Sequence, residues 1–204
     1  GVQGYIPKKP HGKLRDLFHR SFFGYHLEKN LCRVLPSVSA TYPVVLDGVT
    51  ECQWLSGANH SYKRQILEEF QYDEQLIKYC DGEDLEFSYR VFKRYPGQLF
   101  ITPFALLSHS SSMTARAQVR ERVYMREVYN LYLFFKLFDN TLKNKSIYLW
   151  SRIGWLLLTL ARLLIKQKLS ALSDLKHLLG AFYMCLRHFK EIKKGNLQFF
   201  NRTL

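Results

Sequence analysis

The chain changes character at about residue 112, and this change constrains the fold more than any other feature. Residues 1–112 carry 13 Lys and Arg against 12 Asp and Glu, whereas residues 113–204 carry 17 against 5. The first part interleaves short apolar runs with Gly and Pro, while the second shows helical spacing throughout. The sequence therefore predicts a mixed α/β domain over residues 1–112 and a basic, all-α extension over residues 113–204.

Apolar periodicity and turn residues place the individual elements. In the first part we expect helices over residues 14–23, 62–70 and 83–94, a short helix that ends near Tyr79, and strands over residues 52–55 and 99–101. In the second part we expect three helices, over residues 114–138, 146–168 and 173–194, with Ser173 as the N-cap of the third.

The cysteines and the first residues indicate the cellular setting. Cys32, Cys52, Cys80 and Cys185 lie far apart without a C-x-x-C pair, which predicts neither a zinc site nor a disulfide framework. A reducing, cytoplasmic setting follows. The chain begins with Gly and shows no secretory signal, so we expect further sequence upstream.

Three short motifs occur in a fixed order. W-L-S-G-A-N at residues 54–59 continues into S-Y-K-R, Y-D-E at residues 72–74 precedes G-E-D at residues 82–84, and a lone His109 follows an apolar run. Together with Arg90, six residues after Asp84, they resemble the acceptor-side half of the family 2 glycosyltransferases of GT-A fold. The resemblance covers residues 54–109. More loosely, the helical part is similar to that of members that build bacterial surface polysaccharides.

This resemblance implies a partial GT-A (Rossmann-like) domain followed by the helical extension. It also implies an inverting enzyme that transfers a sugar from a nucleotide-sugar donor to a saccharide or polyprenyl-linked saccharide acceptor. A complete member has an Asp-x-Asp ahead of this region that supplies most ligands of a divalent metal, Mn or Mg. This sequence contains none, so we expect the donor half to lie upstream and this chain alone to be an inactive fragment.

The pair Glu83 and Asp84 is the candidate for the chemistry. Inversion by single displacement needs one carboxylate to take the proton of the acceptor hydroxyl. Asp84 lies in the first turn of an expected helix, where the helix dipole stabilises a carboxylate by about 0.3–1 kcal/mol. The resemblance makes Asp84 the general base and Glu83 an acceptor-binding residue. The alternative is that both are ordinary helix-start acids.

The resemblance adds further site residues. Trp54, Gly57 and Asn59 would bind the acceptor, since an indole stacks on a sugar ring and a glycine permits close approach of the backbone; the alternative is a buried Trp before an ordinary turn. Arg90 is either a structural partner for an acid on its own helix, which we favour, or a phosphate contact.

Histidine provides the remaining candidate ligand. His109 would complete the metal shell, or else be a hydrogen-bonded residue at a strand end. The other histidines lack such a setting and are expected on the surface: His11, His19, His26, His60, His177 and His188.

The basic extension contains an amphipathic segment over residues 146–165. Arg152 and Arg162 interrupt its apolar run, which argues against a membrane span. One wedge of its helical wheel is polar and aromatic, with Tyr148, Arg152, Trp155, Thr159, Arg162 and Lys166, and the opposite stripe is apolar, with Leu149, Ile153, Leu156, Leu160 and Leu164. Such a helix suits the plane of an anionic leaflet, at the inner face of the cytoplasmic membrane.

Other interpretations of the extension stay open. The segment could span the membrane, or pack on the third helix as a hairpin in water. Besides the glycosyltransferase, a second interpretation of the whole protein is a basic module that binds nucleic acid. No recognised motif supports it, and the long Leu runs argue against a solvated basic face. A third interpretation is a membrane-peripheral scaffold without catalysis.

Overall fold

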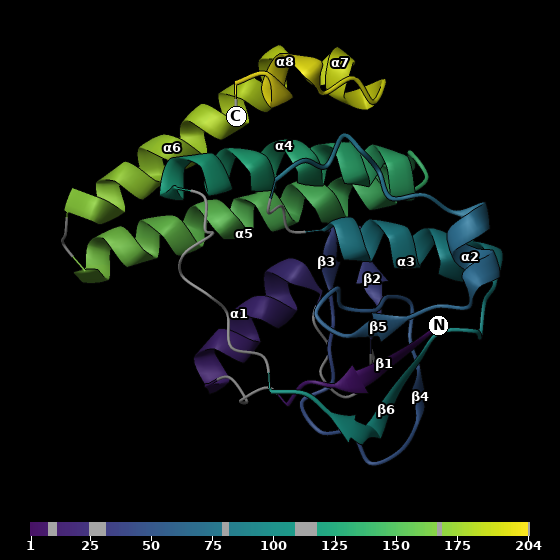
Figure 1. Cartoon of the computed structure of the whole chain (residues 1–204). Coiled ribbons are helices and arrows are strands. Elements are labelled where there is room, and N and C mark those ends of the chain that lie inside the picture. The colour runs from purple at the N-terminus through teal and green to yellow at the C-terminus, as the bar shows by residue number, and fades with distance from the viewer. Residues whose placement is uncertain (8–11, 25–31, 79–81, 109–117, 167–168, 204) are drawn as a thin grey trace. The chain divides into compact units, whose positions relative to one another are not determined.

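The structure is a computed structural model that describes residues 1–7, 12–24, 32–78, 82–108, 118–166 and 169–203. Two compact units make up the chain: unit 1 comprises Gly1–Asp73 and Gly82–Ser112, and unit 2 comprises Glu74–Asp81 and Met113–Leu204. Unit 1 combines helices with a small mixed sheet, and unit 2 is helical (Figure 1). The coarse prediction of an α/β protein with a helical C-terminal region is thus confirmed.

Unit 1 is built on a four-stranded sheet. Its elements are β1 (Val2–Tyr5), α1 (Lys13–Phe23), β2 (Val34–Leu35), β3 (Ser39–Ala40), β4 (Thr50–Glu51), β5 (His60–Ser61), α2 (Arg64–Glu69), α3 (Glu83–Arg94) and β6 (Phe100–Leu106). The strand order is β4-β6-β1-β5, and β2 and β3 form a separate pair. The central strands β1 and β6 run parallel, and each edge strand is antiparallel to its neighbour.

The core of unit 1 forms between the sheet and α3. Phe87 and Val91 of α3 pack with Leu55, Leu99 and Ile101, and all five are at most 1% exposed. Full burial of such a side chain contributes about 1.5–3 kcal/mol. This burial fixes the rotation of α3 and therefore the direction in which its first turn points.

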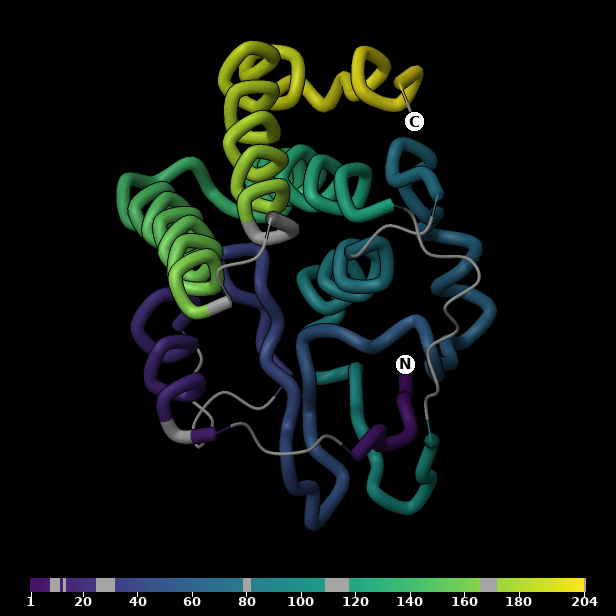
Figure 2. The backbone as a smooth tube through the Cα atoms, turned by 90° about the vertical axis from the view of Figure 1, so that its left-hand side faces the viewer, coloured from purple at the N-terminus to yellow at the C-terminus, as the bar shows by residue number. Residues whose placement is uncertain are grey.

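Unit 2 contains three long helices followed by two short ones. They are α4 (Val119–Leu137), α5 (Leu142–Lys166), α6 (Leu169–Arg187), α7 (Phe189–Lys193) and α8 (Gln198–Asn201). α6 packs against both α4 and α5, and α4 also packs against α7. Figure 2 follows this path from α4 to the C-terminal helices.

Several predicted elements differ from those observed. Residues 52–55 are not a strand, because the amide of Cys52 donates to Leu99 O (2.9 Å) whereas that of Gln53 donates to Cys32 O (2.7 Å), so no single ladder continues. The predicted strand over residues 99–101 is the start of the longer β6. Residues 74–78 form turns and bends, and Lys78 has a φ of 58°, which a right-handed helix does not accommodate.

The third predicted helix also has different bounds. It begins at Leu169, so Ser173 lies inside α6, and its hydroxyl lies 3.1 Å from the His177 ring one turn later. The helix then breaks at His188, where α7 starts as a separate element. The prediction of Ser173 as an N-cap was therefore wrong.

The two sides of α5 differ in exposure. Arg152 and Thr159, in the polar wedge, are only 8% and 9% exposed, whereas Leu149 and Leu164, in the apolar stripe, are 61% and 75% exposed. The cause lies on α4, where the carboxylate of Glu127 accepts a hydrogen bond from Arg152 Nη1 at 3.0 Å. Arg152 of the polar wedge therefore faces inward, whereas Arg162 of the same wedge and the two leucines are exposed.

Candidate functional site

The first turn of α3 joins two of the sequence motifs. Gly82, the N-cap residue, has a φ of 117°, which an L side chain rarely adopts. Two residues later, Asp84 Oδ2 accepts a hydrogen bond of 2.8 Å from the backbone amide of Gly57. Asp84 Oδ1 accepts another of 2.8 Å from the amide of Leu85. The carboxylate of G-E-D is thus anchored to the turn of W-L-S-G-A-N while the Asp84 residue remains partly exposed.

A buried serine strengthens this junction. Ser88 is completely buried on α3, its hydroxyl donates to the carbonyl of Asp84, and its Oγ accepts from the amide of Leu55 at 3.1 Å. At the turn, a Cβ added to Gly57 would lie 3.4 Å from Asp84 Cβ. The two segments therefore lie in van der Waals contact, and Asp84 has little room to change position.

Tyr72 and His60 border the same site. The Tyr72 ring stacks on Phe87 with centroids 4.3 Å apart, and its hydroxyl lies 3.0 Å from His60 Nε2. His60 Nδ1 lies 3.0 Å from the carbonyl of Ser56. Because a carbonyl only accepts, His60 Nδ1 is the donor in this contact.

Burial first, and then the negative charges of Glu83 and Asp84, raise the pKa of Tyr72 above its ordinary value. The Tyr72 hydroxyl therefore keeps its proton at neutral pH. Sequence reasoning placed His60 on the surface and missed this pair; Tyr72 belongs to Y-D-E, which was the only available signal.

Two predicted acceptor-binding residues are held by the fold itself. Trp54 is half-buried, its indole Nε1 donates to the Thr41 carbonyl at 2.9 Å, and its ring meets Tyr42 edge-on. Asn59 lies against β1, where a Cβ added to Gly4 would come within 2.5 Å of Asn59 Nδ2. Glu83, in contrast, is exposed beside Asp84.

Arg90 faces an acid on its own helix. Its guanidinium pairs with the fully buried Glu86, with Nε 2.5 Å from Oε1, and donates to the carbonyl of Gln71 at 2.6 Å. It also lies over the rings of Phe70 and Phe87, 5.6 and 5.7 Å from their centroids. These contacts tie residues 70–71 to α3 and account for Arg90 without a phosphate ligand.

The structure does not test the prediction that His109 binds a metal. His109 lies outside the described residues. Within the described part of the chain, no three His, Cys, Asp or Glu side chains gather as a metal site would require.

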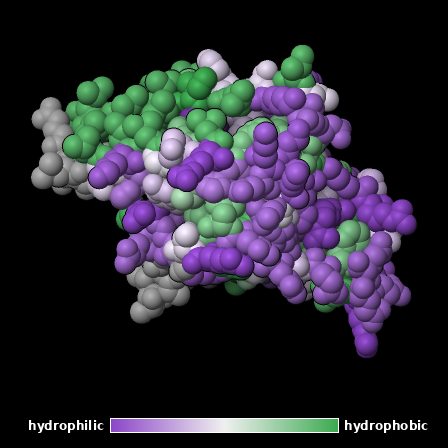
Figure 3. All heavy atoms as spheres, turned by 90° about the horizontal axis from the view of Figure 1, so that it is seen from above, coloured by the Kyte–Doolittle hydropathy of each residue, from purple (hydrophilic) through white to green (hydrophobic). Residues whose placement is uncertain are grey.

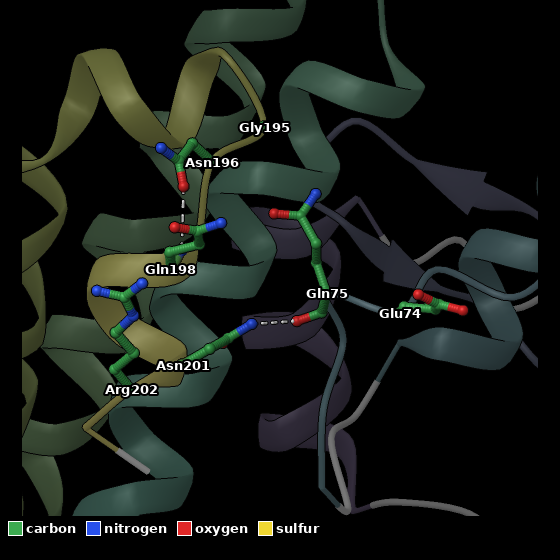
Figure 4. A pocket seen from close by; sticks show the side chains of 7 residues that line it. All are labelled: Glu74, Gln75, Gly195, Asn196, Gln198, Asn201 and Arg202. Atoms are coloured by element: carbon green, nitrogen blue, oxygen red, sulfur yellow. Dashed lines mark hydrogen bonds between the residues drawn. The ribbon is translucent and has the colours of Figure 1, made fainter.

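The described residues of unit 2 line cavities, and two of them bear on function. The first, of about 570 Å³, lies between residues 74–75 and the segment that includes α8 (Figure 4). Asn201 Nδ2 donates to the Gln75 carbonyl at 2.8 Å, and Asn196 Oδ1 accepts from the Gln198 amide at 3.1 Å. The first bond holds Gln75 against α8 and the second is a local turn contact, so structural roles explain both.

The second cavity, of about 350 Å³, is lined by residues of α4, α5 and α6. Three arginines contribute to its lining, Arg122 and Arg126 from α4 and Arg162 from α5. This concentration of positive charge is absent from the sequence motifs, because the three residues come from two helices.

Unit 2 also exposes much apolar surface. One helix, Leu142–Ile165, is long and apolar enough to cross a membrane, although only weakly so, and 28% of its apolar window is buried. On α6, Leu179 and Leu186 are 50% and 74% exposed. Figure 3 shows hydrophobic side chains gathered over this helical region.

Comparison with known proteins adds no relative: no family model, no curated protein and no solved structure matches the chain. Any functional conclusion therefore depends on the residues and their geometry.

Proposed function

We propose that unit 1 is the acceptor side of an inverting, GT-A-type glycosyltransferase, with Asp84 as its general base. One observation carries the proposal: Asp84 Oδ2 lies 2.8 Å from the amide of Gly57, so the two motifs that resemble family 2 enzymes meet in space. They are separated by 27 positions in the sequence. A pair of unrelated helix-start acids would not require this contact.

The geometry suits a base. Each carboxylate oxygen of Asp84 accepts one backbone hydrogen bond, and each can accept another. In the proposed reaction, the acceptor hydroxyl gives its proton to Asp84 as its oxygen bonds to the anomeric carbon of the donor. The bond from that carbon to the diphosphate oxygen breaks on the opposite face, and the nucleoside diphosphate leaves.

The neighbouring side chains would bind the acceptor. Glu83 is exposed next to Asp84 and could accept from saccharide hydroxyls. The half-buried Trp54 offers part of its indole for stacking, and Tyr72 stays protonated near the two carboxylates. The divalent metal and most of its ligands would belong to the donor half, upstream of this chain.

The variant Asp84→Asn tests this role. The protein should be made with its natural upstream sequence and supplied with labelled nucleotide sugars and membrane extract as acceptor. Incorporation of sugar into lipid-extractable material should fall by about 10²–10⁴-fold, the usual contribution of a positioned base.

Two controls isolate the base from the fold. Glu68→Gln removes a carboxylate that is 60% exposed and pairs with the exposed Arg64, so it should leave transfer unchanged. The Asn side chain has one acceptor oxygen, so Asp84→Asn loses the hydrogen bond from one of the two backbone amides and with it some stability. The thermal midpoint of each variant shows whether the protein is still folded. A folded Asp84→Asn protein that transfers sugar within threefold of wild type would exclude Asp84 as the base.

We further propose that unit 2 holds the protein on the inner face of the cytoplasmic membrane. Leu149 and Leu164 of α5 and Leu179 and Leu186 of α6 are all at least half exposed. Their burial in a leaflet would contribute about 4–8 kcal/mol before the cost of immobilisation. The excess of 17 basic over 5 acidic residues after residue 112 adds attraction to anionic lipid.

Vesicle flotation distinguishes this proposal from nucleic-acid binding. The double variant Leu164→Ser/Leu186→Ser should lose most of its flotation with anionic vesicles. Leu14→Ser, which alters an 85% exposed side chain in unit 1, should not. A wild-type protein that stays on heparin but never floats would favour the nucleic-acid interpretation instead.

A further inference from the structure

We infer that the arginine-lined cavity of unit 2 is a binding site for a phosphate or diphosphate group. We call it the arginine cavity; it has a volume of about 350 Å³, and Arg122, Arg126, Arg162 and Asp174 line it. The inference does not depend on Asp84 or on sugar transfer, because every residue involved belongs to unit 2.

The spacing of the arginines brings their charges together. Arg122 and Arg126 are one turn apart on α4, so they share a face, and like charges at this spacing cost some helix stability. On α5, Trp155, Thr159 and Arg162 also share a face, at intervals of four and three residues. The cavity between these two faces is therefore lined by three positive charges, and packing of the helices does not require them.

The acid nearest to Arg126 does not neutralise the cavity. Glu127 is 1% exposed and accepts from Arg126 Nε at 2.8 Å and from Arg152 Nη1 at 3.0 Å. One carboxylate is thus shared by two guanidinium groups. Arg126 is also held over the Trp155 ring, 4.3 Å from its centroid, which fixes the guanidinium at the cavity wall.

The other two arginines remain available. Arg122 and Arg162 are exposed, and no ion pair of either is recorded with the residues that the structure describes. Among the described lining residues, three positive charges therefore face the single acid Asp174. The lining carries a net charge of about +2, which matches a phosphate monoester or a diphosphate.

The chemistry of the lining favours phosphate over a simple carboxylate. Guanidinium groups bind phosphate oxygens in a bidentate manner, and three such groups from two helices can surround one tetrahedral anion. The cavity is within the size range of small-ligand sites.

The surroundings suggest one source of this group. Ile165, three residues after Arg162 and on the same face of α5, is 82% exposed, so the cavity lining adjoins apolar surface. A lipid phosphate could place its headgroup among the arginines and its chains along Ile165. A free diphosphate would need only the arginines.

Calorimetry with inorganic pyrophosphate tests the site itself. The variant Arg122→Gln/Arg162→Gln leaves Arg126 and its buried ion pair intact. Its pyrophosphate affinity should fall by about tenfold or more, because charge-assisted hydrogen bonds are lost. The matched control Lys143→Gln/Lys190→Gln removes the same net charge from exposed positions of unit 2 outside the cavity and should change the affinity less than twofold.

Vesicles distinguish the two sources. Flotation is compared between phosphatidylcholine vesicles with phosphatidic acid and vesicles with phosphatidylserine at equal surface charge. A preference for phosphatidic acid that the Arg122→Gln/Arg162→Gln variant loses assigns a lipid phosphate. Pyrophosphate binding without that preference assigns a soluble phosphate ligand.

Two results would overturn the inference. One is equal pyrophosphate affinity in the arginine and lysine variants, since binding would then follow net charge alone. The other is the absence of both pyrophosphate binding and any preference for phosphatidic acid.

Discussion

The buried ion pair of unit 2 makes a quantitative prediction for Glu127→Gln. Gln has the shape of Glu and keeps one acceptor oxygen, but it removes the negative charge that pairs with Arg152. Arg152 is 8% exposed and would remain charged in a desolvated position. Breaking a buried pair in this way costs about 3–5 kcal/mol.

Two contacts of Arg152 reduce this cost. Its Nε and Nη2 lie 3.2 and 3.1 Å from Ser151 Oγ, and its guanidinium carbon lies 4.9 Å from the centroid of the Tyr148 ring. Both contacts survive in the variant. We therefore expect a loss of about 3 kcal/mol, which lowers the thermal midpoint by about 6–12 °C.

Urea unfolding followed by circular dichroism at the helix band measures this loss. A second variant, Glu127→Gln/Arg152→Met, removes the more buried of the two guanidinium groups that pair with Glu127. It should recover much of the stability, because an apolar side chain of similar length replaces the arginine. The reasoning would be refuted by a loss below about 1 kcal/mol for Glu127→Gln. It would equally be refuted if Arg152→Met made the Glu127→Gln protein less stable rather than more.

Two further predictions concern the packing around this ion pair. Gly180→Ala should destabilise the protein by about 1–3 kcal/mol, because its Cβ would lie 2.1 Å from the Tyr124 hydroxyl oxygen. Adding Tyr124→Phe should partly restore stability in the same urea assay. An unchanged stability of Gly180→Ala would contradict the close packing. Burial first, and then the charge of Glu127, raise the pKa of the Cys185 thiol from 9.0 to about 12. The unfolded chain therefore releases this proton at lower pH than the folded protein. The free energy of unfolding should fall between about pH 9 and 12, by up to about 4 kcal/mol. The variant Cys185→Ala should show a smaller fall over the same pH range.

The sequence predicted α3 well because several local signals agree there. The Asp81-Gly82 turn marks its start, the spacing of Leu85 and Phe92 gives its period, and Pro96-Gly97 marks its end. The observed bounds, Glu83–Arg94, confirm the prediction. Where local signals conflict, as at residues 74–78, the predicted helix was wrong and a turn with a left-handed residue occurs instead.

The candidate site could be predicted only in part. The types of residue, a carboxylate at a helix start and a turn with glycine, are readable from the motifs. The hydrogen bonds from Gly57 to Asp84 and from Leu55 to Ser88 join positions 27 and 33 residues apart, and only the packing of α3 on the sheet produces them. His60 was assigned to the surface for the same reason, since its partner Tyr72 is twelve positions away.

The orientation of α5 shows why a helical wheel alone is insufficient. The wheel correctly separates a polar wedge from an apolar stripe, but it contains no information about which side meets the rest of the protein. That choice depends on Glu127, an acid on α4 that is 1% exposed and has no place in the pattern of α5. With the arginine turned inward to this acid, the leucines must face outward. Arg152 argued against a membrane span in the sequence, but in the fold its charge is paired with Glu127 inside unit 2 and does not lie on the surface that would meet lipid.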